Sequence, residues 1–486
     1  MCKDTFQMTV TLSSFQGMQG TQAALSVGER PPLPWESHPP DPIALVPAGA
    51  SHPVTQRRHR CIAAIQEVQL SALRSFLPEP QQHDTKKTLL LIDPGYHANV
   101  GDHMITVAEQ EIFKRLGWKA EVEAYSRTMQ KTWQGNTDPP AKTSSESHYL
   151  ECHYIQAAEL VPHCQDVIQA IAQQSATPQQ QQQQQLLAVW HGGGNWGDLW
   201  PSVHRARLEQ SFQALLRANF SVYGMPQSLY YREKVVQDYD ARLLKHQIQK
   251  GLLGREKPSP VMLTWREHES FDQAQQLYPY VQHSVLPDIA FQLGPYNWRD
   301  FVQPAETRAQ VDFLFLLRRD HESMILPPQK EANDDNDEGE QEHGGALNAT
   351  AMAEHIRNAV NLAMEKSGSR DSFQSSFRVV DWPDRLHLFQ SKDPFFTKTA
   401  IQLLAMGRVL ICDRLHAAIL AFLTDHIPFV YLDQSTGKIS KCLRLALDSA
   451  GNGCNSGNSA PDALGFSRAD NLTDAIQKAG QLLKLS

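Results

Sequence analysis

The chain has 486 residues, of which 41% are hydrophobic and 20% are charged, so it is long enough for two or three folded domains with a sizeable core. Its formal net charge of −8 at pH 7 argues against general nucleic-acid binding, because phosphate backbones select basic surfaces. No apolar run of about 18–20 residues predicts a membrane span, and the seven cysteines form no C-x-x-C pair that would indicate zinc. Their odd number does not indicate a disulfide framework, although one or two bridges remain open.

Residues 1–85 are rich in Pro, Gln, Ser and Thr and are expected to form a poorly ordered extension. Within them, the apolar spacing from Cys61 to Phe76 predicts one helix. The first residues lack the apolar core of a signal peptide, so the sequence as written predicts a soluble protein. A chain whose leader is missing from the sequence would look the same, so the secretory pathway stays open as the alternative.

Strands and helices alternate from residue 86 onward. Thr88–Asp93 predicts a buried strand, Asp102–Leu116 a helix and Lys119–Tyr125 a second strand, and this order is typical of a parallel sheet. Further elements are expected as strands at 186–190, 220–223 and 261–265, and as a helix at 202–218. We therefore expect an N-terminal Rossmann-like domain over residues 86–300.

A second block of strands and helices predicts a C-terminal Rossmann-like domain over residues 308–486. Its expected elements are strands at 311–317, 377–381, 409–412 and 429–432, and helices at 398–406 and 417–423. The glutamine tract at 179–185 and an acidic insert at about 327–347 are expected to be loops. The sequence thus predicts an α/β fold in which two Rossmann-like domains face a cleft.

Two glycine-containing motifs follow predicted strands, where open α/β sheets place their ligand sites. Asn99-Val-Gly101-Asp102 begins a helix whose N-terminus favours an anion, although a plain cap with Asp102 as the N-cap residue also explains it. The run His191-Gly192-Gly193-Gly194-Asn195 predicts a nest of backbone N–H groups that binds an anion. A structural turn with a hydrogen-bonded histidine is the alternative.

Arginine and histidine follow two other predicted strands. Arg266 would bind a carboxylate or phosphate through two hydrogen bonds, or else pair with Glu267 or Glu269. Asp413-Arg414-Leu415-His416 combines a fixed cation with a group that titrates near neutral pH, which suits an anionic substrate and a proton transfer. An Asp413–Arg414 ion pair with a helix-capping histidine is the alternative. No histidine spacing indicates a metal site, and no P-loop is present.

In chain order, these motifs together with Gly224-Met-Pro-Gln-Ser228 and Gly437-Lys438 resemble the polysaccharide pyruvyl transferase family, over about residues 88–445. The resemblance implies a fold similar to the GT-B glycosyltransferases. It also implies transfer of the enolpyruvyl group of phosphoenolpyruvate onto a sugar, often galactose or N-acetylmannosamine, as a pyruvate ketal. Arg266 and Arg414 would then hold the donor, and His416, together with His191, would move protons.

The expected catalytic residues are His416, His191 and Arg414. The expected substrate-binding residues are Arg266, Asn99, Gly101, Asp102, Gly192, Gly193, Gly194, Asn195, Leu415 and Lys438. The expected partners are phosphoenolpyruvate and a sugar or glycan acceptor, with no metal, no redox cofactor and no nucleic acid. Two alternatives stay open: a nucleotide-sugar glycosyltransferase of the same architecture, and a non-catalytic glycan-binding protein, which would lack the arginine and histidine positions.

Overall fold

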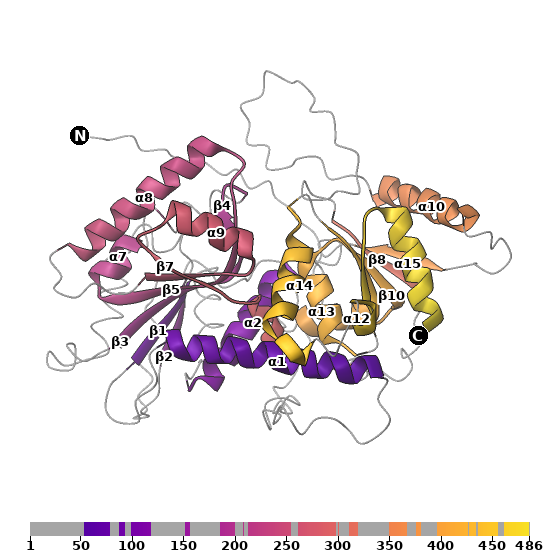
Figure 1. The fold of residues 1–486 in the computed structure, drawn as a ribbon, viewed down its shortest axis with the longest axis horizontal. Coiled ribbons are helices and arrows are strands. Elements are labelled where there is room, and N and C mark those ends of the chain that lie inside the picture. The colour runs from indigo at the N-terminus through magenta and orange to yellow at the C-terminus, as the bar shows by residue number, and fades with distance from the viewer. Residues whose placement is uncertain are drawn as a thin grey trace, which may run out of the picture. The chain divides into compact units, whose positions relative to one another are not determined.

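Two parallel β-sheets organise the protein (Figure 1). The computed structural model describes residues 53–77, 87–92, 99–117, 151–155, 185–199, 208, 212–253, 261–297, 300, 311–318, 349–366, 376–380, 396–425, 427–433, 436–454 and 461–485. Within these ranges, no helix is both long and apolar enough to cross a lipid bilayer.

The N-terminal sheet has the strand order β2-β1-β3-β5-β6-β7, with β4 paired to β5, and all of its pairs are parallel. Its strands are β1 (Lys87–Ile92), β2 (Glu151–Ile155), β3 (Gln185–Trp190), β4 (Gly193–Gly197), β5 (Phe220–Tyr230), β6 (Val261–Trp265) and β7 (Gln282–Val285). Its helices are α2 (Val100–Arg115), α7 (Phe212–Arg217), α8 (Lys234–Leu252), α9 (His268–Leu277) and the 3-10 helix η3 (Ile289–Gln292). The apolar run of β3 is fully buried from Leu187 to Trp190, as is usual for a parallel sheet covered on both faces.

The C-terminal sheet has the strand order β12-β11-β10-β8-β9 and is also parallel. Its strands are β8 (Val311–Leu316), β9 (Phe377–Val380), β10 (Gly407–Cys412), β11 (Phe429–Leu432) and β12 (Phe466–Ala469). Its helices are α10 (Ala349–Lys366), α12 (Phe396–Leu404), α13 (Leu415–Leu423), α14 (Lys438–Ser449) and α15 (Leu472–Leu485), with the short 3-10 helices η7 (Gly451–Gly453) and η8 (Pro461–Leu464).

Both sheets contain a point at which the strand order reverses. In the N-terminal sheet this point lies between β1 and β3, and in the C-terminal sheet it lies between β8 and β10. Connections leave such neighbouring strands in opposite directions, and the crevice between them is the usual ligand site of an open α/β sheet. His191 follows β3, and Arg414 and His416 follow β10. The motifs found in the sequence therefore lie at the reversal points of both sheets.

The predicted α/β fold with parallel sheets is confirmed. The strands β6 and β11 begin and end at the predicted residues, and most other predicted strands and helices agree within two residues at each end. The predicted strand at 119–125, the acidic insert at 327–347 and the glutamine tract before Gln185 lie outside the described residues. Within the predicted helix at 202–218, the residues Phe212–Arg217 form α7. The domain boundaries stay predictions.

The strand β5 is longer than predicted. We expected Gly224–Ser228 to leave the strand as a loop, because it contains Gly and Pro, but β5 continues to Tyr230. The pairing of β5 with β6 shifts register between Gly224 and Gln227, which accommodates the missing N–H of Pro226. The extra length brings Ser228 to the end of β6, where Arg266 begins the next loop.

Helix α1 (Pro53–Phe76) begins eight residues before the predicted start at Cys61. Its buried face is unusually polar, and among the described residues the Arg58 guanidinium donates hydrogen bonds only to backbone carbonyls. These carbonyls belong to Ala421, Thr424, Ile427, Leu464 and Gly465. Burial lowers the pKa of Arg58 to about 10, against the opposing charge of Asp425, so the side chain stays charged at neutral pH. A disulfide between Cys61 and Cys454 adds a covalent link to the same region.

The other half of α1 contacts the segment around η3. Gln69 donates to the carbonyls of Pro287 and Asp288, at 3.0 and 2.8 Å, and Gln66 donates to the carbonyls of Phe291, Leu293 and Gly294. Buried carbonyls without a partner would be costly, so these amides stabilise the path of the chain after β7. Helix α1 thus joins the segment that carries η3 to helices beside the C-terminal sheet.

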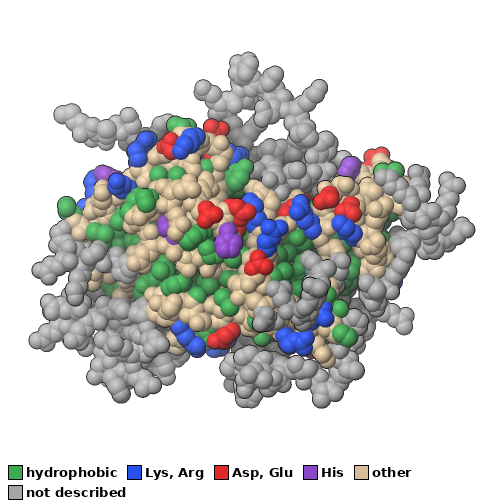
Figure 2. Space-filling model, viewed as in Figure 1, with side chains coloured by type: hydrophobic (Ala, Val, Ile, Leu, Met, Phe, Trp, Pro, Cys, Tyr) green, Lys and Arg blue, Asp and Glu red, His purple; other side chains and the backbone are tan. Residues whose placement is uncertain are grey.

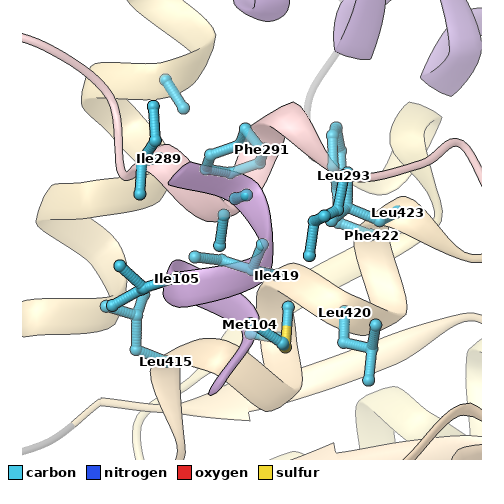
Figure 3. Packing of buried hydrophobic residues seen from close by; sticks show 14 of the residues in the cluster. Met104, Ile105, Ile289, Phe291, Leu293, Leu415, Ile419, Leu420, Phe422 and Leu423 are labelled. Atoms are coloured by element: carbon cyan, nitrogen blue, oxygen red, sulfur yellow. The ribbon is translucent and has the colours of Figure 1, made fainter. Parts of the chain in front are cut away.

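Apolar side chains pack α2, η3 and α13 against one another (Figure 3). The cluster includes Met104 and Ile105 from α2, Ile289 and Phe291 from η3, and Leu415 and Ile419 from α13. Burial of each such side chain contributes about 1.5–3 kcal/mol. This packing fixes the first turns of α2 and α13, which carry the Asn99–Asp102 motif and His416, next to each other.

Candidate active site

Arg266 lies at the centre of the candidate site and is 1% exposed. Its Nε donates to Ser228 Oγ at 2.8 Å, and its Nη1 donates to Asp288 Oδ2 at 2.5 Å. The predicted pairing with Glu267 or Glu269 is therefore replaced by an ion pair with Asp288. No hydrogen-bond partner of Nη2 lies among the described residues, and this atom faces Gly194. One edge of the guanidinium is thus available for a ligand.

Gly194 lies between two cationic side chains. A Cβ atom at this position would be 3.4 Å from Arg266 Nη2 and 3.1 Å from Lys438 Nζ. Lys438 is the first residue of α14 and follows Gly437, which has a φ of 67° that favours glycine. The lysine comes from beside the C-terminal sheet and the arginine from the N-terminal sheet. The absence of a side chain at Gly194 leaves room for an anion between the two cations.

Asp288 connects Arg266 to His416. Its Oδ2 lies 2.5 Å from Arg266 Nη1 and 3.3 Å from His416 Nε2, and its Oδ1 accepts from the backbone N–H of Ala290. The contact with His416 is at ion-pair distance but is not aligned as a hydrogen bond. Burial alone would raise the pKa of the Asp288 carboxyl, but His416 and Arg266 together hold it well below its usual range. Asp288 is therefore an anion that lies between the Arg266 guanidinium and the His416 ring.

The Asn99–Asp102 motif places a glycine against His416. A Cβ atom at Gly101 would lie only 2.3 Å from His416 Nδ1, so a larger residue would displace the imidazole. The sequence correctly predicts a helix cap here, but it assigns the N-cap to Asp102. Asn99 is the N-cap residue, and its Oδ1 accepts from Gly101 N–H, while Asp102 accepts from Asn99 Nδ2 at 2.8 Å. The capping bonds fix the turn on which Gly101 approaches His416.

His191 is buried against a carboxylate of α2. Its Nδ1 lies 2.7 Å from Glu109 Oε2, and Glu109 Oε1 accepts from Gly192 N–H at 2.9 Å. The predicted nest is wrong for this part of the chain, because Glu109 uses the N–H of Gly192 and the following glycines belong to β4, which pairs with β5. The glycines instead permit close packing, since a Cβ atom at Gly192 would lie 2.9 Å from a backbone oxygen of β5. Glu109 thus fixes His191 and the start of β4 on α2.

Burial of His103 should make the protein less stable in mild acid. Burial, with a smaller contribution from nearby His191, lowers the pKa of His103 to about 4, compared with about 6.5 in an unfolded chain. Between these values the unfolded state binds more protons, so the free energy of unfolding falls as the pH falls. Protonation of His103 in the unfolded state should lower the free energy of unfolding by about 2 kcal/mol between pH 7 and pH 5. Urea unfolding at both pH values should show a smaller difference for His103→Gln than for the unchanged protein. An equal difference in both proteins would contradict the assignment.

A cavity of about 130 Å³ opens beside these residues and is lined from both halves of the molecule. Its walls include Gly194, Ser228, Tyr230, Glu267, Thr436 and Lys438. Lys441 and Glu269, which also line it, lie 3.8 Å apart. Figure 2 shows acidic and basic side chains next to one another on this face, near α9 and α14. A larger cavity of about 660 Å³ is lined by α8 and α9 alone and contains none of the expected site residues. The smaller cavity is therefore the candidate site, and its two-sided lining agrees with the predicted cleft.

The structure brings part of the predicted set together. Contacts link Gly101, Gly194, Arg266, His416 and Lys438 into one group through Asp288. Gly193 lies near Asp102, since a Cβ atom there would be 3.6 Å from Asp102 Oδ1. Arg414 is 9% exposed and precedes α13.

Two other residues, Leu415 and Asn195, belong to the predicted substrate-binding set. The side chain of Leu415, which we expected at the substrate, is buried in the apolar cluster of α2 and α13, because this helix must present an apolar face to α2 (Figure 3). The side chain of Asn195 lies outside the described residues. Asp413 Oδ1 accepts from the backbone N–H of Arg318 at 2.7 Å, which ties the ends of β8 and β10 together.

Sequence reasoning missed three residues that shape the site: Asp288, Glu109 and Ser228. Asp288 follows β7, whose sequence Gln-His-Ser-Val lacks the apolar pattern of a strand. Glu109 lies in a polar stretch of α2 that resembles a solvated helix face. Ser228 was quoted within a motif but without a role. A signal for Asp288 was its position after Leu286-Pro287, since a polar residue that follows such a break can cap a short helix.

Residues 99–436, well over half of the chain, match the family model described as polysaccharide pyruvyl transferase. The chain belongs to the polysaccharide pyruvyl transferase family. The resemblance drawn from the motifs is confirmed, and the expected class of enzyme is that of the family. The matched range includes every candidate site residue except Lys438, which lies two positions beyond it.

This family member is also similar to individual proteins. It is 29% identical over 256 residues to "Pyruvyl transferase 1" from Schizosaccharomyces pombe (strain 972 / ATCC 24843), which is 52% of this chain and 52% of that protein. The match thus spans about half the length of the relative. Among solved structures, it is similar to "OtsA apo structure" (TM-score 0.37, 9% identity, 82% of this chain and 98% of that chain). It is also similar to "Spinosyn Rhamnosyltransferase SpnG complexed with thymidine diphosphate" (TM-score 0.30, 10% identity, 82% and 96%). Structural similarity at this level carries no argument about activity.

Proposed function

We propose that this protein transfers the enolpyruvyl group of phosphoenolpyruvate onto a sugar, of galactose type, in a polysaccharide or glycan, where it forms a pyruvate ketal. The observation that carries the proposal is the meeting of Arg266 and Lys438 at Gly194, beside a histidine that contacts a buried carboxylate. Family membership and the similarity to a pyruvyl transferase support the same reaction.

The donor carries a carboxylate and a phosphate, and the site offers cations for both. Arg266 is held by Ser228 and Asp288, so its remaining edge is oriented before the donor binds. Such fixed, charge-assisted donors bind anions more strongly than mobile surface lysines do. Lys438 supplies the second charge on the opposite side of Gly194. Arg414 is buried and lies two residues before His416 in the sequence. We assign it to the remaining anionic group of the donor.

His416 is assigned to proton transfer because it is the partly exposed histidine of the cluster, with 14% of its side chain accessible. In the proposed first step the imidazolium protonates the methylene carbon, and C2 becomes an oxocarbenium-like centre. A sugar hydroxyl attacks C2 and returns its proton to the imidazole. In the second step the C2–O bond to phosphate breaks, phosphate leaves with the electron pair, and a second hydroxyl closes the ketal and gives its proton to the departing phosphate. Neither step routes through a metal or a redox cofactor.

His191 has a different environment, since it is 1% exposed and bound to Glu109. We assign it to the support of β4, and through β4 to the position of Gly194. Its share in proton transfer stays a prediction. In this scheme Asn99 and Asp102 hold the turn of Gly101, and the glycines of β4 form one wall of the donor site.

The test is phosphate release from phosphoenolpyruvate with and without a panel of galactosides, followed by mass spectrometry of the sugar. Acceptor-dependent release and a sugar with a pyruvyl ketal would establish donor, reaction and acceptor class together. No release, with no donor binding by calorimetry, would reject the proposal. Turnover of a nucleotide sugar that phosphoenolpyruvate does not inhibit would establish the glycosyltransferase alternative instead.

Arg414→Ala should raise the KM for phosphoenolpyruvate and remove most turnover, with a loss of at least 100-fold in kcat/KM. A buried charge-assisted contact to an anionic donor contributes this much when its partner is desolvated. Steady-state kinetics with varied donor would measure the change. Arg357→Ala on α10, an exposed position, serves as the control. A kcat/KM within threefold of the unchanged protein would remove Arg414 from donor binding.

A further inference from the structure

We propose that Asp288 is the positioning residue of the site, which holds His416 through Nε2 so that Nδ1 is the nitrogen that exchanges protons with the substrate. The inference rests on the proposed function for the identity of the reaction. Its structural part, the orientation and tautomer of His416, holds independently of which substrate is used.

The carboxylate of Asp288 is placed for this task by four contacts. Its Oδ1 accepts from Ala290 N–H at 3.0 Å, which makes it the N-cap of η3. Its backbone carbonyl accepts from Gln69 of α1 at 2.8 Å. Its Oδ2 faces both Arg266 and His416. The side chain is fully buried, so it has little freedom to turn away from either cation.

The two nitrogens of His416 lie in different surroundings. Nε2 is shielded from solvent and faces the Asp288 carboxylate at 3.3 Å, so a proton on this atom has an acceptor. Nδ1 packs against Gly101, because the missing Cβ atom leaves room for the imidazole itself. The acceptor nearest to a ring nitrogen favours one tautomer, and here the Asp288 carboxylate oxygen, at 3.3 Å, favours a proton on Nε2. The neutral ring therefore carries its proton on Nε2 and presents Nδ1 as the proton acceptor.

Charged groups on each packed element contribute to the behaviour of His416. Asp288 lies beside η3, Arg266 follows β6, and Asp102 is the neighbour of Gly101 on α2. Asp288 is the anion in direct contact with the ring, with Oδ2 at 3.3 Å from Nε2. Ionised Asp288 also holds Arg266 at the donor. One carboxylate thus sets the position of the donor and of the acid together.

The first test compares kcat and the donor KM of Asp288→Asn and Asp288→Glu. Loss of the carboxylate should lower kcat about 100-fold, because the His416 ring loses the group that orients it. Asp288→Glu should recover part of the rate. Ser228→Ala, which loosens only the Nε of Arg266, should raise the donor KM and leave kcat in place. A kcat within threefold of the unchanged protein in Asp288→Asn, in a variant with the normal circular dichroism spectrum, would overturn the proposal.

A second test does not depend on the stability of a variant or on turnover. In protein labelled with ¹⁵N histidine, long-range ¹⁵N–¹H spectra at high pH distinguish the two tautomers, and His416→Gln identifies the signals of His416. We expect the proton on Nε2. A proton on Nδ1 would overturn the inference whether or not phosphoenolpyruvate is the donor. Normal Nε2 protonation without any pyruvyl transfer would leave the positioning intact and reject only the proposed reaction.

Discussion

His416→Gln should lower kcat for ketal formation by about 1,000-fold while the protein remains folded. General acid catalysis contributes about 10²–10⁴-fold, and glutamine keeps a polar side chain of similar reach but carries no titratable proton. Because His416 is partly exposed, its replacement leaves no large buried void. The measurement is steady-state phosphate release at saturating donor, with thermal unfolding as a check on the fold.

His355→Gln is a matched control, because His355 is an exposed histidine on α10. It should retain the full rate. If His416→Gln stays within threefold of the unchanged protein, the proton donor must be another group, and His191 becomes the first alternative to test.

Gly101→Ala should separate activity from stability. Alanine favours a helix over glycine by roughly 0.5–1 kcal/mol, and Gly101 lies in the first turn of α2 with an ordinary helical backbone. The added Cβ would nevertheless lie 2.3 Å from His416 Nδ1 and 2.8 Å from its Cγ, so the ring must rotate away from Asp288. We expect kcat to fall about 100-fold with little loss in the midpoint of thermal unfolding.

Lys114→Ala provides a control for the helix itself, because Lys114 is exposed on α2 and its replacement adds no atom near His416. This variant should retain activity. If Gly101→Ala is fully active, the space beside Nδ1 has no part in the reaction, and the assignment of that nitrogen to proton exchange fails with it.

The sequence predicts local features of this site better than its long-range pairs. Strands such as β6 and β11 are short apolar runs with clear ends, so the residues after them are found correctly. Arg266 and His416 therefore appear as candidates without the structure. Their partner Asp288 does not, because it follows a strand of polar sequence and gains its importance only when three distant segments meet.

Polar side chains in buried positions account for most of the remaining differences. Arg58, Gln66 and Gln69 give α1 the composition of a solvated helix, yet each is buried because backbone carbonyls accept its N–H groups. Glu109 is similar, since its burial depends on His191 and Gly192. The spacing of apolar residues is the signal that predicts a buried helix face. A face whose polar side chains bind loops far along the chain does not give this signal.

The position of α1 in the chain has a consequence for biosynthesis. Cys61 is translated 393 residues before Cys454, and the carbonyls that accept from Arg58 come from residues 421–465. As the ribosome proceeds, the partners of Gln66 and Gln69 at residues 287–294 emerge first, and those of Arg58 emerge much later. The Arg58 end of α1 can therefore dock only after residues 421–465 are made. A nascent chain stalled before residue 421 would leave the Arg58 guanidinium without the carbonyls that accept from it.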